Sequence, residues 1–149
     1  MRSVVKGFFV VAQVFAASLA AAESPLSSLV TGDDSRGWEG VGRLEVGNSA
    51  FCTATLIAPD KVLTAAHCLF DPDTGHRVAD HEIEFLAGWR NSRANAQARV
   101  RVSAVHPDYR YNGPSRTDHV WNDVALLQLE APIRKSSVKP LALGKRPRK

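Results

Sequence analysis

The chain has 149 residues, of which 44% are hydrophobic, and a formal net charge of +4. This length fits about one domain, and the composition is ordinary for a globular protein. The positive charge belongs to the two ends. Without Arg2, Lys6 and the four basic residues of the "KRPRK" tail, 13 basic residues stand against 15 acidic ones, a net charge of −2. Nucleic-acid-binding domains carry basic residues along their body, so we expect no nucleic-acid partner.

The first 22 residues resemble a secretory signal peptide. Arg2 and Lys6 precede the uncharged apolar run "GFFVVAQVFAASLA", and small residues at Ala20–Ala22 suit cleavage before Glu23. A membrane anchor is the alternative, but the run is shorter than the roughly 20 apolar residues that span a bilayer. We therefore expect a secreted or periplasmic protein that has no membrane association after cleavage of residues 1–22.

The rest of the chain divides into an arm, a body and a tail. Residues 23–37 are polar and are interpreted as an extended arm, and residues 144–149 as a solvated basic tail. Between them, over 38–143, short β-type runs alternate with Gly/Pro/Asp turns and with the expected surface loops 71–76 and 106–119. The expected strands are Glu39–Val46, Phe51–Ile57, Lys61–Ala65, Glu82–Gly88, Ala98–Val105 and Asp123–Leu129. Six short strands without a long helical period favour an all-β barrel or sandwich.

Cys52 and Cys68 are the two cysteines of the chain. An even number of cysteines in a secreted protein suggests a disulfide. Such a bridge would close a loop of about 15 residues, which contributes on the order of 3 kcal/mol in the chain-entropy model. The alternative is a pair of free buried thiols.

His67 ends the apolar run "VLTAAHC", where a single helical turn can follow the strand. A disulfide at Cys68 would limit the movement of the imidazole, which suits a general base. A single histidine after an apolar run is, however, more often structural. Asp123 opens the apolar run "DVALLQL", where a half-buried carboxylate needs a donor. It is either the acid that orients a catalytic histidine or a residue of a turn or of a strand start.

Together these segments resemble the chymotrypsin/trypsin-like serine proteases. "FCTATLIAPDKVLTAAHCLFD" is similar to the region around that family's catalytic histidine, and "VHPDY" and "NDVALLQLEAPI" are similar to the segments around its catalytic aspartate. The resemblance covers about Trp38–Leu143. It implies that His67 is the general base, that Asp123 orients it, and that Cys52 and Cys68 are bridged. It also implies a six-stranded antiparallel β-barrel equivalent to the first of the family's two barrels, and a protein or peptide substrate.

The resemblance does not extend to the nucleophile. The family's Gly-Asp-Ser-Gly-like turn is not found, and Ser136 and Ser137 lack flanking glycines. We expect a secreted serine endopeptidase that has lost the serine half with the second barrel, and that is inactive alone. The barrel face that is left exposed would need that second barrel or a partner. The alternative is a non-catalytic secreted binding module.

We expect neither a metal nor a cofactor. Asp71, Asp73 and Glu82 fall at positions 1, 3 and 12 of a calcium loop, but Gly75 lies one position early and Pro72 interrupts the pattern. No His/Cys spacing matches a zinc motif. A metal-binding domain that uses His67, His76 and His81 is kept as an alternative. His76, His81, His106 and His119 match no catalytic position and are interpreted as loop residues.

Overall fold

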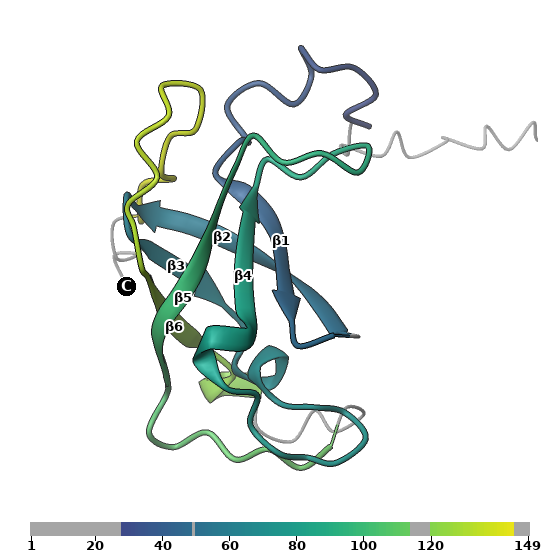
Figure 1. Cartoon of the computed structure of the whole chain (residues 1–149), viewed down its shortest axis with the longest axis vertical. Coiled ribbons are helices and arrows are strands. Elements are labelled where there is room, and N and C mark those ends of the chain that lie inside the picture. Colours follow the sequence, from purple (N-terminus) through teal and green to yellow (C-terminus); the bar gives the residue numbers. More distant parts are fainter. Residues whose placement is uncertain (1–27, 49, 114–119, 145–149) are drawn as a thin grey trace, which may run out of the picture.

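The computed structural model describes residues 28–48, 50–113 and 120–144. These residues form a closed β-barrel in which all neighbouring strands are antiparallel (Figure 1). The strands are β1 (Val41–Val46), β2 (Ala50–Ala58), β3 (Lys61–Thr64), β4 (Ile83–Ala87), β5 (Ala96–Val105) and β6 (Ala125–Leu129). They follow one another around the barrel in the order β1-β2-β3-β6-β5-β4. The expected single six-stranded antiparallel barrel is confirmed.

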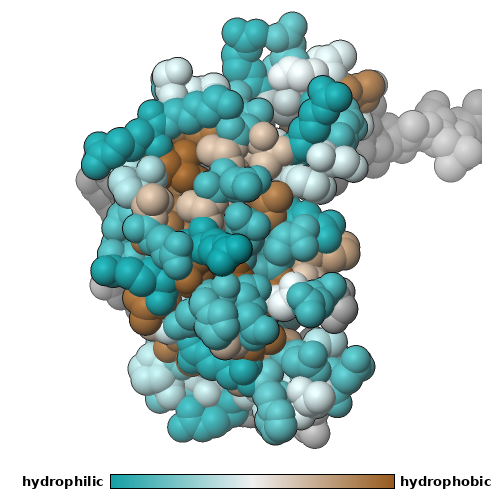
Figure 2. All heavy atoms as spheres, in the orientation of Figure 1, coloured by the Kyte–Doolittle hydropathy of each residue, from teal (hydrophilic) through white to brown (hydrophobic). Residues whose placement is uncertain are grey.

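The barrel interior is filled by the apolar residues that alternate along each strand. In β1 the buried residues alternate with half-buried ones, and in β6 every second residue is buried. This period of two is the spacing at which a strand presents one face to a core. The largest fully buried side chains are Phe85, Leu44, Leu56, Leu69, Ile83, Leu127, Leu129, Val46, Val62 and Val100. On the face seen in Figure 2, over β4 and β5, apolar residues lie in patches between hydrophilic ones.

Gly42 allows β1 and β4 to approach closely. It is paired with Ala87 in the β1–β4 ladder. A Cβ atom at position 42 would lie 2.2 Å from the carbonyl oxygen of Leu86 and 2.9 Å from the Cα of Ala87. Both are backbone atoms, so neither can rotate away. The absence of a side chain at this position is therefore a requirement of barrel closure.

Short 3-10 turns connect the strands at the end of the barrel that is lowest in Figure 1. They are η1 (Ala66–Leu69), η2 (Asp80–Glu82) and η3 (Val120–Asn122). The turn expected after "VLT" is η1. The strand expected from Asp123 begins only at Ala125. The backbone N–H of Asp123 instead donates to the Val120 carbonyl at 3.4 Å, so that η3 continues into this residue.

Segments before and after the strands pack against the barrel. Arg90 donates from Nη1 to Ser35 Oγ at 3.0 Å and from Nη2 to the Leu29 carbonyl at 3.2 Å, and it also donates to the carbonyls of Val30 and Thr31. The arm that precedes β1 is thus held against the β4–β5 hairpin. After β6, the chain returns along the barrel. Ile133 and Val138 are buried there.

Some expectations concern residues outside the described ones. These are the signal peptide 1–22, residues 145–149 of the basic tail, and His119. In the described ranges, no helix has the length and apolar character that crossing a membrane requires.

Candidate active site

His67 lies on η1, directly after the short strand β3. Ala65 and Ala66 separate it from Thr64, the last residue of β3. The hydroxyl of Thr64 donates to the Thr53 carbonyl of β2 at 2.9 Å, which attaches the end of β3 to its neighbour. The side chain of His67 is 53% exposed. The imidazole is thus held at the barrel rim, where it is open to another molecule.

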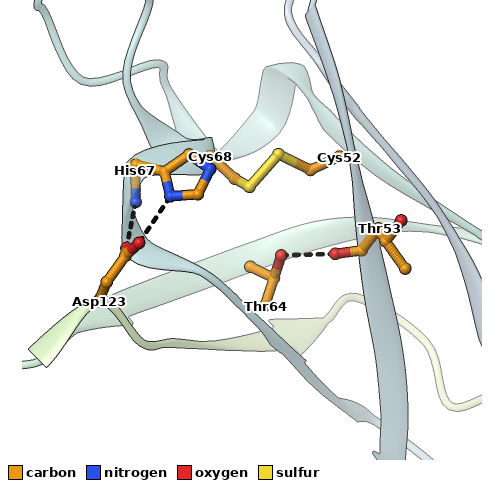
Figure 3. The surroundings of a disulfide bond; sticks show 6 residues. All are labelled: Cys52, Thr53, Thr64, His67, Cys68 and Asp123. Atoms are coloured by element: carbon orange, nitrogen blue, oxygen red, sulfur yellow. Dashed lines mark hydrogen bonds and ion pairs between the residues drawn. A yellow bond between two sulfur atoms is a disulfide. The ribbon is translucent and has the colours of Figure 1, made fainter. Parts of the chain in front are cut away.

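Asp123 binds His67 through both carboxylate oxygens (Figure 3). Oδ2 lies 2.7 Å from Nδ1 of the imidazole, and Oδ1 accepts the backbone N–H of His67 at 2.8 Å. Only 21% of the Asp123 side chain is exposed. A shielded carboxylate on Nδ1 favours the tautomer that carries its proton there, and it stabilises the imidazolium when the ring gains a second proton. Nε2 is left as the free base.

A disulfide fixes η1 from the other side. Cys68 follows His67 directly and is bonded to Cys52 of β2. Figure 3 shows the imidazole lying between the disulfide and the Asp123 carboxylate. The turn that carries His67 is therefore attached to β2 by a covalent bond and to the η3–β6 segment by two hydrogen bonds. This arrangement limits the freedom of the ring more than packing of exposed residues would.

Three aromatic residues pack together directly after η1, and the sequence analysis did not assign them a role. Tyr109 is buried, although it lies in the expected surface loop 106–119. Phe70 stacks on Tyr111 with 4.7 Å between the ring centroids, and it lies 6.0 Å from the ring of Tyr109. Burial, and then the negative charge of Asp123, raise the pKa of Tyr109 to about 12. The sequence signal that could have indicated this burial was the pair of aromatic residues, Tyr109 and Tyr111, in an otherwise polar loop.

Among the described residues, His76, His81 and His106 do not join this site. The structure brings Cys52, His67 and Cys68 together, with ligand-type atoms within 4.8 Å of one another. His76 and His81 belong to no such group with His67 within residues 28–48, 50–113 and 120–144. The alternative of a metal centre made of these three histidines is thus not supported by the described part of the chain.

Asp71, the first acidic residue of the possible calcium loop, holds the backbone of its own loop. Oδ1 of Asp71 accepts hydrogen bonds from the backbone N–H groups of Asp73 and Thr74, at 3.0 and 2.7 Å, and from the Thr74 hydroxyl at 2.9 Å. The backbone hydrogen bond from Thr74 is the main cause that lowers the pKa of Asp71. This carboxylate therefore stabilises its own turn, in the manner of an Asx turn.

Exposed apolar side chains lie near Asp123 in the sequence and in the fold. Trp121 and Val120 of η3 are 90% and 55% exposed, and Leu126 of β6 is 42% exposed. Val124 lies between them and is 38% exposed. A monomeric surface rarely gathers large apolar side chains without a function.

A closed antiparallel barrel, with a His–Asp pair and a disulfide at its rim, corresponds to the first barrel of trypsin-like serine proteases. The family model described as Trypsin matches residues 30–149. The chain therefore belongs to the trypsin family of serine proteases.

Characterised relatives agree with this assignment. The chain is 34% identical over 95 residues to a trypsin of Saccharopolyspora erythraea, a match that covers 64% of this chain and 36% of the relative. It is 34% identical over 96 residues to human kallikrein-11, which covers 64% of this chain and 31% of the relative. It is also 31% identical over 93 residues to the modular serine protease of Drosophila melanogaster, a match that covers 58% of this chain and 14% of the relative. The matches thus span about a third or less of these relatives.

Proposed function

We propose that His67 and Asp123 form the proton-transfer half of a secreted serine endopeptidase. In this reaction Nε2 of His67 takes the proton of a serine hydroxyl as the oxygen attacks a peptide carbonyl, and it then gives that proton to the leaving amine. A water molecule repeats the sequence on the acyl-enzyme. Asp123 holds Nδ1–H and stabilises the imidazolium in both steps. The observation that carries the proposal is the double contact of Asp123 with His67.

The nucleophile in this proposal comes from outside these 149 residues. The sequence holds no Gly-Asp-Ser-Gly-like turn, and Ser136 and Ser137 are exposed after β6 without flanking glycines. A second barrel would supply the serine and the oxyanion hole, and would cover apolar side chains such as Trp121. Because the nucleophile and the oxyanion hole provide most of the transition-state stabilisation, we expect no hydrolysis by residues 1–149 alone.

A hybrid enzyme tests whether His67 and Asp123 supply proton transfer while a second barrel supplies the nucleophile. Residues 23–144 are joined to the second barrel of the Saccharopolyspora erythraea trypsin, and hydrolysis of a peptide substrate is measured. The hybrid should be active, its His67→Ala variant should lose nearly all activity, and the exposed control His76→Ala should not. Equal activity of the His67→Ala variant, or an inactive hybrid that folds and pairs its barrels, would contradict the proposal.

The chain itself provides a second test. A serine-directed phosphonate should not label the purified 149-residue protein, and labelling would disprove the absence of a nucleophile. Secretion is tested separately, by expressing the chain with its residues 1–22. Mass spectrometry of the medium should then find a protein that begins at Glu23, whereas retention of the full chain in the membrane would contradict cleavage.

A non-catalytic secreted binding module is the second candidate. It is favoured by the 90% exposure of Trp121 beside Asp123. If the barrel serves binding alone, protein partners should be captured from the secreted fraction by the chain and lost with Trp121→Ala. His67→Ala should then have no effect, which separates this function from the first.

A further inference from the structure

A groove runs along the outer wall of the barrel beside β1, and two connected hollows form it. The first, of about 490 Å³, lies between the arm before β1, the start of β1 and the β4–β5 hairpin. The second, of about 300 Å³, lies over β1 and β2. Val41 and Trp89 line both hollows, which makes them one continuous surface. We propose that this outer groove binds an extended, acidic segment of the substrate polypeptide, away from the bond that is cut.

The floor of the outer groove is held in place before any ligand binds. Val41 and Arg43 are half-buried residues that alternate with buried ones along β1, so they face the outside of the barrel. Cζ of Arg43 lies 3.9 Å from the ring centroid of Phe51 and 5.6 Å from that of Trp89. Nε of Arg43 also donates to the Glu45 carboxylate at 2.7 Å. A floor fixed in this way loses little side-chain freedom on binding.

Aromatic side chains stand at both ends of the outer groove. Trp38, in the arm, is 55% exposed, and Phe51, in β2, is 63% exposed. Figure 1 shows the arm and the β4–β5 hairpin together at the end of the barrel opposite the 3-10 turns. Ligand pockets of a few hundred Å³ are typically lined by apolar and aromatic side chains with a few polar groups. The outer groove has both the size and the lining of such a site.

The charge of the outer groove selects an acidic ligand. Three arginines and a single acidic residue, Glu39, line it in the described part of the chain. Glu39 accepts the backbone N–H of Gly37 at 2.8 Å, and Arg90 donates to the arm. Arg93 is exposed, and none of the ion pairs between described residues includes it. A carboxylate can pair with this guanidinium through charge-assisted hydrogen bonds, whereas a basic segment would meet a like charge.

The position of the outer groove points to the substrate as the ligand. Cys52 lines the hollow over β1 and β2, and its disulfide partner Cys68 directly follows His67. Figure 3 shows this disulfide beside the imidazole. A polypeptide cut at His67 can therefore continue past Cys52 into the groove. The choice of a substrate segment rests on the proposed function, whereas peptide binding itself is measured without hydrolysis.

The binding test uses the oxidised full chain and a synthetic peptide. The peptide has ten residues and blocked ends, with glutamate and leucine alternating at odd positions and serine at even ones, so that one face of an extended strand carries both. The chain has three tryptophans, and Trp121→Phe leaves Trp38 and Trp89 as reporters. Their emission should change saturably with the glutamate peptide. The matched glutamine peptide should bind about fivefold more weakly or worse, and equal affinities would overturn the proposal.

Variants test whether the peptide lies in the outer groove. Arg93→Gln should weaken the glutamate peptide by about fivefold in calorimetry, the upper range for an exposed ion pair, and leave the glutamine peptide unchanged. Arg101→Gln is the matched control, since it removes an equal charge from β5 and lines neither hollow. Trp38→Ala should weaken both peptides. Equal effects of Arg93→Gln and Arg101→Gln would mean that net charge alone attracts the peptide, and the proposal would be wrong.

The hybrid enzyme separates this proposal from the proposed function. Its substrates carry the acidic segment on one side or the other of the cleaved bond. One of the two should show a lower KM than its glutamine counterpart, and Arg93→Gln should remove the difference without changing kcat. Peptide binding with no effect on KM in an active hybrid would overturn the assignment to the substrate. A folded hybrid that cleaves nothing, beside intact peptide binding, would contradict the proposed function alone.

Discussion

Asp123 holds both the ring and the backbone of His67. Its Oδ2 lies 2.7 Å from Nδ1, and its Oδ1 accepts the His67 backbone N–H at 2.8 Å. A carboxylate that bonded only the ring could let the turn shift beneath it. Here η1, which carries His67, and the η3–β6 segment, which carries Asp123, are joined directly. The orientation of the base therefore depends on one side chain that comes from a distant part of the sequence.

Replacing Asp123 by Asn should change the tautomer of His67. The amide nitrogen of Asn can donate to Nδ1, which moves the ring proton to Nε2 and removes the free base. Nitrogen NMR of the ¹⁵N-labelled chain, at a pH where the ring is neutral, should show the proton on Nδ1 in the unsubstituted chain and on Nε2 in the variant. In the hybrid enzyme kcat should fall by about 10⁴-fold, as for a serine protease that keeps its geometry but has the wrong tautomer.

Asp71→Asn is the matched control. The Asp71 carboxylate bonds to its own loop through Asp73 and Thr74. The same loss of one negative charge should leave the His67 tautomer unchanged. A tautomer that responds equally to both substitutions would mean that overall charge, and not the contact with Asp123, controls the ring.

The sequence predicted the strands because their signal is local. Apolar residues alternate at a period of two in strands such as β1, with "RLEV", and that pattern sets which face is buried. The pattern left a barrel and a sandwich open, and the single barrel followed from the family resemblance. The His67–Asp123 pair could be predicted only through the family resemblance, since no local rule joins two residues from turns that lie far apart in the sequence. Tyr109 was misplaced for a related reason. Its neighbours are polar, and its burial comes from packing near Phe70 and the site.

Tyr109 should give an alkaline titration that depends on Asp123. Burial and the Asp123 charge raise its pKa from 10.0 to about 12. Ultraviolet titration should show a tyrosinate component near that value, which Tyr109→Phe removes and Tyr111→Phe does not. Asp123→Asn should lower the pKa while leaving it above 10.0, because burial is the larger cause. If the component keeps its pKa in Asp123→Asn, the charge of Asp123 does not act on the phenol.

The raised pKa of Tyr109 also makes the folding stability of the chain depend on pH. Since the folded-state pKa of Tyr109 is raised, folding favours the neutral phenol. This stabilisation is complete below pH 10.0 and is lost as the pH rises through about 12. Urea unfolding at several alkaline pH values should therefore show a steeper loss of stability in the unsubstituted chain than in Tyr109→Phe. Parallel losses in the two proteins would contradict this origin of the pH dependence.

Gly42→Ala should destabilise the barrel although it adds a single methyl group. The new Cβ would lie 2.2 Å from the Leu86 carbonyl oxygen, so β1 and β4 would have to separate. Overpacking of this kind costs about 1–3 kcal/mol. The urea midpoint should fall with the slope unchanged. Gly32→Ala is the control, because a Cβ there meets nothing within 4 Å and Gly32 is not among the glycines with positive φ. Equal midpoints for the two variants would refute the steric argument.

Arg90→Ala should release the arm before β1 without weakening the barrel. The guanidinium of Arg90 bonds Leu29, Val30, Thr31 and Ser35 at once. Hydrogen bonds to a charged group contribute about 1.5–3 kcal/mol each, so hydrogen exchange at the Thr31 amide should accelerate by at least about tenfold.

Exchange in β2 and β5 should not change, because Arg90 lies outside both strands. Arg90→Lys should restore little protection, since an ammonium group cannot reproduce the fork of donors that reaches several acceptors. Arg93→Ala, three positions after Arg90 and paired with it in a short bridge, removes an equal charge from the same hairpin and should leave the arm protected. An arm that exchanges at the same rate in Arg90→Ala and Arg93→Ala would show that the hairpin charge, and not the Arg90 contacts, holds it.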